Sequence, residues 1–150
     1  MPENTSTGAL FLANTFSIQI DGITLESLKS VSGLSLDVEV VTSESVVDSS
    51  GSHFTTKVPG KKNVPSITIV RGLNKNKALT DWIAKSRSET VTEAKKNVTI
   101  TFQDTEKKEK RTATLGGVWV SRWSVGDLGA SQSSEVDETV VLECDTIEFK

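Results

Sequence analysis

Histidine and cysteine, which often carry out acid–base and nucleophilic chemistry, occur once each in this sequence of 150 residues, and its many carboxylates lie on polar strand faces. His53 is the only histidine, and it follows the polar stretch Asp48-Ser49-Ser50-Gly51-Ser52. A Ser-His-Asp triad works only when rigid elements hold its three groups at fixed distances, and a Ser/Gly-rich turn does not do so. Cys144 is the only cysteine and is far from His53 in the chain, which makes a poor zinc site. The sequence therefore predicts no catalytic residue, no metal ligand and no cofactor.

Other motifs that often mark a binding site have simpler explanations here. The sequence contains neither a P-loop nor a dinucleotide-binding glycine fingerprint. The basic residues from Lys107 to Arg111 are interleaved with Glu106 and Glu109, which favours a charged turn over nucleic-acid recognition. Three tryptophans lie in apolar patterns and are expected to pack in a core or an interface, namely Trp82, Trp119 and Trp123. We therefore expect a protein that is not an enzyme and that acts by assembling.

Charge is distributed unevenly along the chain, although the net charge is only −3, from 17 basic and 20 acidic residues. No lysine or arginine occurs over residues 31–56 or 124–149, whereas both are frequent between Lys57 and Arg122. Two explanations remain open. These regions are either separate solvated faces, or acidic strands of one copy face basic loops of another copy.

The cysteine content and the hydropathy pattern indicate where the protein is made. A single cysteine excludes an internal disulfide and suits a reducing compartment. No apolar run reaches the length of a membrane span, and the N-terminus lacks the basic-then-apolar pattern of a signal peptide. We expect a soluble protein, made in the cytoplasm, with no membrane anchor.

Alternating apolar and polar residues predict β-strands over most of the chain. Residues 16–20 alternate before Asp21-Gly22, a dipeptide typical of a type I′ hairpin turn. The longest alternation starts at Leu34 and leads into a hairpin that we expect to project over residues 41–56. Residues 1–14 are expected to form an arm that is flexible alone or ordered by a partner.

One amphipathic helix is predicted after a strand at residues 66–70. Asn74 is its expected N-cap, an apolar stripe with helical spacing runs from Ala78 to Ile83, and the helix is expected to end near Ser88. Further strands are predicted over residues 97–103, 111–120 and 135–149, with a bulge or bend at Gly116-Gly117. The predicted fold class is mainly β, an antiparallel β-barrel or sandwich with one α-helix, in a single domain of residues 1–150.

The order of several short motifs resembles a known family. The motifs are, in order, Val31-Ser32-Gly33-Leu34, an acidic strand, Lys57-Val58-Pro59-Gly60, the strand Ile67 to Leu73, a short helix with a tryptophan, Gly117-Val118-Trp119-Val120-Ser121, Asp127-Leu128 and the strand Glu135 to Glu143. This ordered set spans residues 16–143. It resembles the tail tube, or inner tube, proteins of contractile phage tails and phage-tail-like contractile injection systems.

The resemblance implies a β-barrel subunit that forms hexameric rings, which stack into a rigid hollow tube. In such systems a contractile sheath protein encloses the tube and drives it through a target envelope. Baseplate, spike and tube-cap proteins are the further partners implied, and protein cargo can occupy the lumen. The subunit would be made in a bacterial cytoplasm and assembled into a phage-tail-like particle or virion.

The resemblance also assigns roles by position. The projecting hairpin and neighbouring residues are expected to form the contacts between subunits and rings, at Val46, Val47, Asp48, Ser49, Ser50, Gly51, Ser52, His53, Phe54, Lys57 and Arg71. A tube also needs strand faces that are polar toward a water-filled lumen. The polar faces expected to line it contain Ser35, Asp37, Glu39, Thr99, Thr101 and Gln103.

Two other functions remain open. A baseplate-proximal tube initiator or an adaptor ring with the same fold would form one ring and stop. A monomeric β-sandwich binding module would remain a monomer at any concentration. Polymerisation beyond one ring distinguishes the tube subunit from both.

Overall fold

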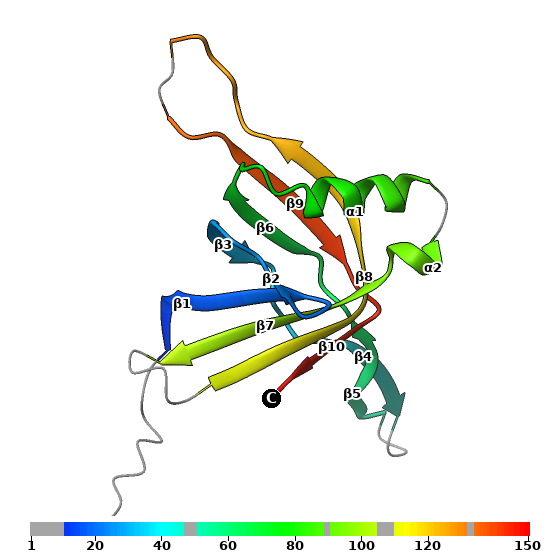
Figure 1. The fold of residues 1–150 in the computed structure, drawn as a ribbon. Coiled ribbons are helices and arrows are strands. Elements are labelled where there is room, and N and C mark those ends of the chain that lie inside the picture. Colours follow the sequence, from blue (N-terminus) through cyan, green and yellow to red (C-terminus); the bar gives the residue numbers. More distant parts are fainter. Residues whose placement is uncertain (1–10, 47–50, 89–90, 105–109, 132–133) are drawn as a thin grey trace, which may run out of the picture.

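The computed structural model describes residues 11–46, 51–88, 91–104, 110–131 and 134–150 (Figure 1). The expected arm up to residue 10, the hairpin tip at 47–50 and the charged turn at 105–109 therefore lie outside the described residues. Within the described ranges, ten strands and two helices follow in the order β1 Phe11–Ile20, β2 Ile23–Thr24, β3 Leu28–Ser32, β4 Asp37–Val46, β5 His53–Asn63, β6 Ile67–Gly72, α1 Ala78–Arg87, α2 Val91–Ala94, β7 Lys96–Asp104, β8 Lys110–Val125, β9 Asp137–Glu143 and β10 Thr146–Phe149.

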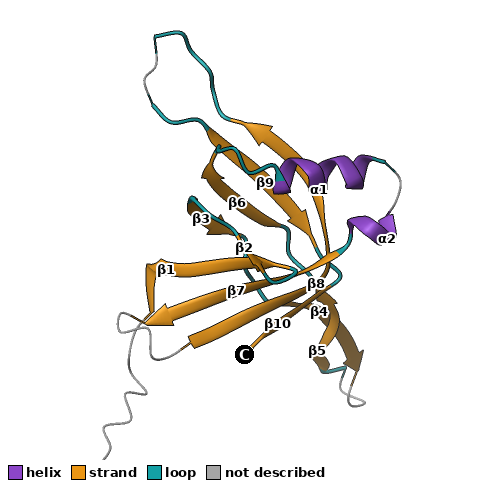
Figure 2. Cartoon of the chain, viewed as in Figure 1, coloured by secondary structure: helices purple, strands orange, loops and turns teal. Residues whose placement is uncertain are grey.

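Most of these strands form one antiparallel sheet, which confirms the mainly β fold class (Figure 2). Its strand order is β2-β1-β7-β8-β9-β6-β3, and β10 pairs with the first half of β8. The predicted turn at Asp21-Gly22 is confirmed, since both residues have positive φ, 49° and 84°. Strands β4 and β5 pair only with each other, as a separate two-stranded sheet.

Strand β8 belongs to both halves of the main sheet. On one side it pairs with β7 from Lys110 to Val118, and on the other it pairs with β10 from Ala113 to Gly116 and then with β9 from Trp119 to Val125. The register shifts at Gly116-Gly117, where Gly117 has a φ of 63°, so the predicted bend is confirmed. The sheet therefore turns on itself, and its two halves face each other across a single hydrophobic core.

Side chains from both halves of the sheet fill that core. Ile18 of β1 lies beside Ile100 of β7 in one half, and Ile69 of β6 lies beside Val140 of β9 in the other. All four are fully buried and belong to the same cluster. Their strands alternate between inward apolar and outward polar residues, as the sequence pattern requires.

Helix α1 closes one side of the core with Leu79 and Trp82, which are both buried. The Trp82 indole N–H donates a hydrogen bond to the carbonyl of Ala94, which ties α1 to the short helix α2. The sequence pattern did not predict α2. The predicted helix end is confirmed, because the N–H of Ser88 caps the carbonyl of Lys85.

The predicted start of the helix is wrong. The helix begins at Ala78, whose N–H donates to the side-chain oxygen of Asn76 at 3.0 Å. Asn74 instead accepts a hydrogen bond from the N–H of Asn76, at 2.9 Å, and so stabilises the loop before the helix. Asn76 therefore satisfies one of the backbone donors that a helix start leaves free, whereas the N-cap residue is Lys77, which makes no side-chain capping bond.

Three boundaries also differ from those predicted. Strand β1 begins at Phe11, so residues 11–14 of the expected arm are part of the sheet. The hairpin is longer at its base than residues 41–56, since β4 starts at Asp37 and β5 ends at Asn63. The predicted last strand is two strands, because pairing passes from β9 to β10 at Cys144-Asp145.

Replacing Gly33 with alanine is expected to destabilise the fold much more than replacing Gly22. Both glycines have positive φ, 93° and 84°, so an alanine meets a backbone penalty of about 1–2 kcal/mol at either position. At Gly33 a Cβ would also lie 2.3 Å from the carbonyl oxygen of Ser66, whereas nothing lies within 4 Å at Gly22. The free energy of unfolding of both variants is measured in urea. Equal losses of stability would show that the backbone at Ser66 moves away from the added Cβ at little cost.

Candidate assembly surfaces

The β4–β5 hairpin stands apart from the rest of the subunit (Figures 1 and 2). Within the described residues, neither strand has a second partner strand. Of the eleven exposed large hydrophobic residues in the described ranges, seven lie in this hairpin or at its base, which concentrates uncovered apolar surface there: Leu36, Val38, Val40, Val41, Phe54, Val58 and Val64. A two-stranded ribbon with both faces in water is marginal by itself, and such uncovered apolar surface marks a candidate contact site.

Most of the predicted interface residues that can be placed lie in this hairpin. Val46 ends β4, residues 47–50 lie outside the described part, and Gly51, Ser52, His53, Phe54 and Lys57 are exposed at the start of β5 or before it. The described residues of this predicted set therefore lie together at one end of the ribbon. Their contacts with another copy remain a prediction.

Arg71 is the exception, and its predicted place at an interface is wrong. Its side chain is fully buried within the subunit, where its Nε forms an ion pair with Glu138, also buried, of β9. Arg71 Nη2 donates to the carbonyl of Asn76 at 3.1 Å, and Trp123 Nε1 donates to the other carboxylate oxygen of Glu138 at 2.8 Å. This cluster joins β6, β8, β9 and the loop before α1, so its role is internal.

The predicted lumen residues of β7 lie on a polar sheet face. Thr99 and Thr101 point to the side opposite the core, and the register places Gln19 and Ser17 of β1 beside them. On the other side, β8 contributes Thr114 and Thr112. The sequence analysis missed these four neighbours, although their alternation with Ile18, Ala113 and Leu115 indicated the same face. The described charges in this area are at its margin, at Lys110, Glu148 and Lys150.

The other predicted lumen residues do not share that face. Asp37 and Glu39 belong to the hairpin, and Ser35 lies at its base, where its hydroxyl donates to Asp37 at 3.0 Å. The two predicted sets therefore lie on separate sheets within one subunit. Only an arrangement of several copies could place both sets on one continuous wall.

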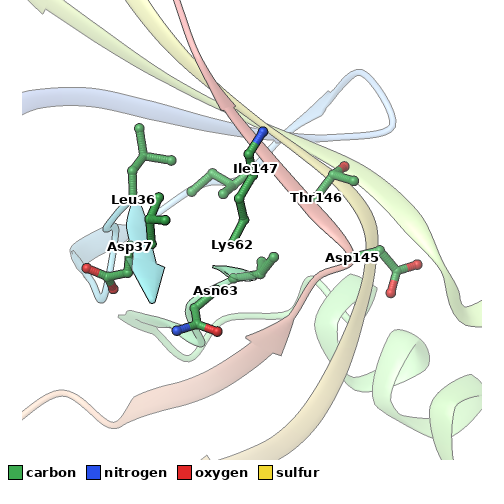
Figure 3. A pocket seen from close by; sticks show the side chains of 9 residues that line it. Leu36, Asp37, Lys62, Asn63, Asp145, Thr146 and Ile147 are labelled. Atoms are coloured by element: carbon green, nitrogen blue, oxygen red, sulfur yellow. The ribbon is translucent and has the colours of Figure 1, made fainter. Parts of the chain in front are cut away.

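An open cleft of about 520 Å³ separates the hairpin base from β10 (Figure 3). Leu36, Val38, Lys62 and Val64 line it from the hairpin side, and Thr146 and Ile147 line it from β10. Strand β10 pairs only with β8 in the described structure, so its outer edge borders this cleft. The lining is largely aliphatic, carries three charged side chains (Asp37, Lys62 and Asp145) and holds neither a histidine nor a thiol, so it fits a docked segment better than a reacting substrate.

Two ionisable groups outside the hairpin, Cys144 and Lys29, have a shifted pKa with a structural cause. Burial raises the pKa of the Cys144 thiol, as do the nearby charges of Glu143 and Asp145, so the thiol stays protonated and is a weak nucleophile. The pKa of Lys29 is raised mainly by its hydrogen bond to Asp137, at 2.6 Å, and this pair connects β3 to β9. Among the described residues, no three acidic, histidine or cysteine side chains lie close enough to hold a metal ion.

An uncovered apolar ribbon on a β-subunit is typical of a protein that assembles with other chains. The chain is a member of the T4-like virus tail tube protein gp19 family, which it matches over residues 12–148. It is therefore a tail tube protein of a phage-like tail, structural and not enzymatic. This confirms the family that the motif order indicated.

Solved structures share this fold. A chain in the cryo-EM structure of the extracellular contractile injection system PVC, a sheath–tube complex in the extended state, has a TM-score of 0.77 and 20% identity, over 94% of this chain and 91% of that chain. A chain of the anti-feeding prophage tube-terminating cap has a TM-score of 0.78 and 19% identity, over 100% of this chain and 99% of that chain. A chain of the anti-feeding prophage baseplate has a TM-score of 0.69 and 18% identity, over 93% of this chain and 94% of that chain.

No curated protein matches the sequence. No helix in the described ranges is both long and apolar enough to span a membrane.

Proposed function

We propose that this tail tube protein is the repeating subunit of a hollow tube built from stacked hexameric rings. A contractile sheath surrounds the tube and propels it through a target envelope, and baseplate, spike and cap proteins hold its ends. Structures with the same fold come from a sheath–tube complex, a tube-terminating cap and a baseplate, which supports these partner classes. The subunit is made in the bacterial cytoplasm and assembled into the particle there.

The hairpin is the observation that carries the proposal. Val40 is 63% exposed and Phe54 57% exposed, on opposite faces of the ribbon, so both faces need a cover. In a stacked tube, the tip residues Val46 to Phe54 and Lys57 contact the next ring, and the base of the hairpin contacts neighbours in its own ring. Burial of this apolar surface on assembly is favourable at about 25 cal/mol per Å².

The polar faces supply the lumen wall. Thr99, Thr101 and Gln103 face water in the subunit together with the hydroxyl and amide groups of β1 and β8. In a ring, Ser35, Asp37 and Glu39 of the hairpin complete this wall. The neutral hydrogen-bonding groups of β1, β7 and β8 let a polypeptide cargo pass that part of the wall without strong adhesion.

Negative-stain electron microscopy of the purified protein at high concentration, with native mass spectrometry, tests the proposal. Hexameric rings and hollow tubes are the expected result. Single rings that do not grow would favour the baseplate-proximal initiator or adaptor ring, for which the baseplate relative is the supporting observation. A monomer at every concentration, even with a baseplate component added, would favour the binding module and overturn the tube subunit.

A further inference from the structure

The turn between β1 and β2 contains a dipeptide that can modify itself. Asp21 is the only aspartate or asparagine in the sequence that is followed by glycine. In such a dipeptide the backbone nitrogen of the glycine can attack the carboxyl carbon of the preceding side chain with little hindrance, because glycine has no side chain. Asp21 and Gly22 are both exposed, and a Cβ built at Gly22 would meet nothing within 4 Å. Side-chain packing therefore does not shield this site, and water reaches it.

The reaction at such a site needs no enzyme and no reactant other than water. The nitrogen of Gly22 forms a bond to Cγ of Asp21, and the carboxyl hydroxyl leaves with the proton of that nitrogen as water, which gives a cyclic succinimide. Water then opens the ring at one of its two carbonyl carbons. One opening restores aspartate, and the other gives isoaspartate, in which the backbone runs through the former side chain.

Isoaspartate in this turn would disturb the core. The register pairs Ile20 with Ile23 across a loop of two residues, and loop length determines the register of a hairpin. Just after this pair, Leu25 is only 5% exposed and belongs to the core cluster, and its N–H donates to the carbonyl of Ile18 at 2.9 Å. An extra backbone carbon in the loop would shift this leucine relative to β1.

Two hydrogen bonds to a single residue of β7 hold Asp21 in place. Its N–H donates to the carbonyl of Asn97 at 2.9 Å, and its carboxylate accepts the N–H of Asn97 at 3.1 Å. Ring closure requires rotation about the bonds that flank the Asp21 Cα, and these two bonds, one to the backbone and one to the side chain, oppose it together. We propose that Asn97 protects the Asp21-Gly22 dipeptide from isomerisation, so that isoaspartate forms there only when the turn separates from β7.

Two changes at Asn97 separate the effect of its backbone from that of its side chain. Asn97→Pro removes the N–H that the carboxylate accepts, whereas Asn97→Ala keeps it. The register of β7 against β8 shifts between Lys96 and Val98, and a strand tolerates proline best at such an irregularity. The folded proteins are incubated at neutral pH, and isoaspartate at residue 21 is followed by fragmentation mass spectrometry of the peptide that contains it.

The proline variant should accumulate isoaspartate at least about tenfold faster than the wild type, because the hydrogen bond to the charged carboxylate is lost. The alanine variant should isomerise at the wild-type rate. Equal rates for the proline variant and the wild type would overturn the proposal. Equally fast isomerisation in the alanine variant would overturn it too, since the backbone N–H is still present there.

A further variant tests the proposal if the proline variant fails to fold by circular dichroism. Asp21→Asn keeps an oxygen that can accept the N–H of Asn97, and ring closure then expels ammonia in place of water, so the reaction changes the mass of the peptide. The folded variant should deamidate at least about tenfold more slowly than the same variant unfolded in urea, because the turn must open first. Equal rates in the two states would show that Asn97 gives no protection.

Discussion

Replacement of Glu138 with alanine should remove about 3–5 kcal/mol from the free energy of unfolding. The change leaves the guanidinium of Arg71 fully buried without its carboxylate, and it also removes the acceptor of the Trp123 indole N–H. A domain of ordinary stability has about 5–15 kcal/mol in total, so the variant should lose a large share of its stability and unfold at a clearly lower urea concentration.

Urea denaturation monitored by tryptophan fluorescence measures this loss. The matched control is Glu135→Ala, since Glu135 is also an acidic partner of a basic side chain, but 82% exposed, and its loss should scarcely change stability. The double variant Arg71→Met/Glu138→Leu should recover more than half of the loss, because apolar side chains of similar size replace the whole pair. Similar stabilities for Glu138→Ala and Glu135→Ala would contradict the assigned role of the buried pair.

The second large effect concerns assembly and not folding. Replacing Val40 and Val58 with serine should leave the monomer as stable as wild type, since both side chains are exposed, at 63% and 44%. Each valine gains about 1.5 kcal/mol or more when a neighbouring copy covers it. The double variant should therefore need about a hundredfold higher concentration to form rings, since about 1.4 kcal/mol corresponds to a tenfold change.

Sedimentation over a range of concentrations measures this threshold. The control Val40→Ile/Val58→Ile keeps the apolar surface and should assemble as the wild type does. Circular dichroism melts at low concentration show whether the monomer is intact. An unchanged threshold for the serine variant would mean that other chains leave these valines uncovered.

Much of the fold could be predicted because local chemistry determined it. The Asp21-Gly22 turn, the alternation of β7 and the stripe on α1 each reflect one short stretch with one stable solution. Arg71 was misplaced although the pattern was informative: it alternates with Ile67 and Ile69, which are both inward and buried. Glu138 likewise alternates with Val140 and Leu142. The position of each residue in its strand therefore indicated burial. Its charge did not prevent burial, because Arg71 and Glu138 form an ion pair with each other.

The remaining differences depend on contacts between distant segments. Residues 135–149 were predicted as one strand, although the apolar positions change parity after Cys144, from Val140 and Leu142 to Ile147 and Phe149. The break arises because β8 bends, and the chain opposite must pass from one part of β8 to another at Cys144-Asp145. The same limit applies to the lumen residues. Alternation shows which side chains share a face of one strand, but Asp37 and Thr99 lie on different sheets.

The shared strand β8 has a mechanical consequence for a tube that is pushed through an envelope. Its sixteen residues run without interruption through both halves of the sheet. A load on one half therefore reaches the other through covalent backbone as well as through side-chain packing. Sliding the two halves past each other would require many ladder hydrogen bonds of β8 to break together under shear. The subunit should thus transmit axial force as a stiff block, and yielding is expected first at the contacts between copies.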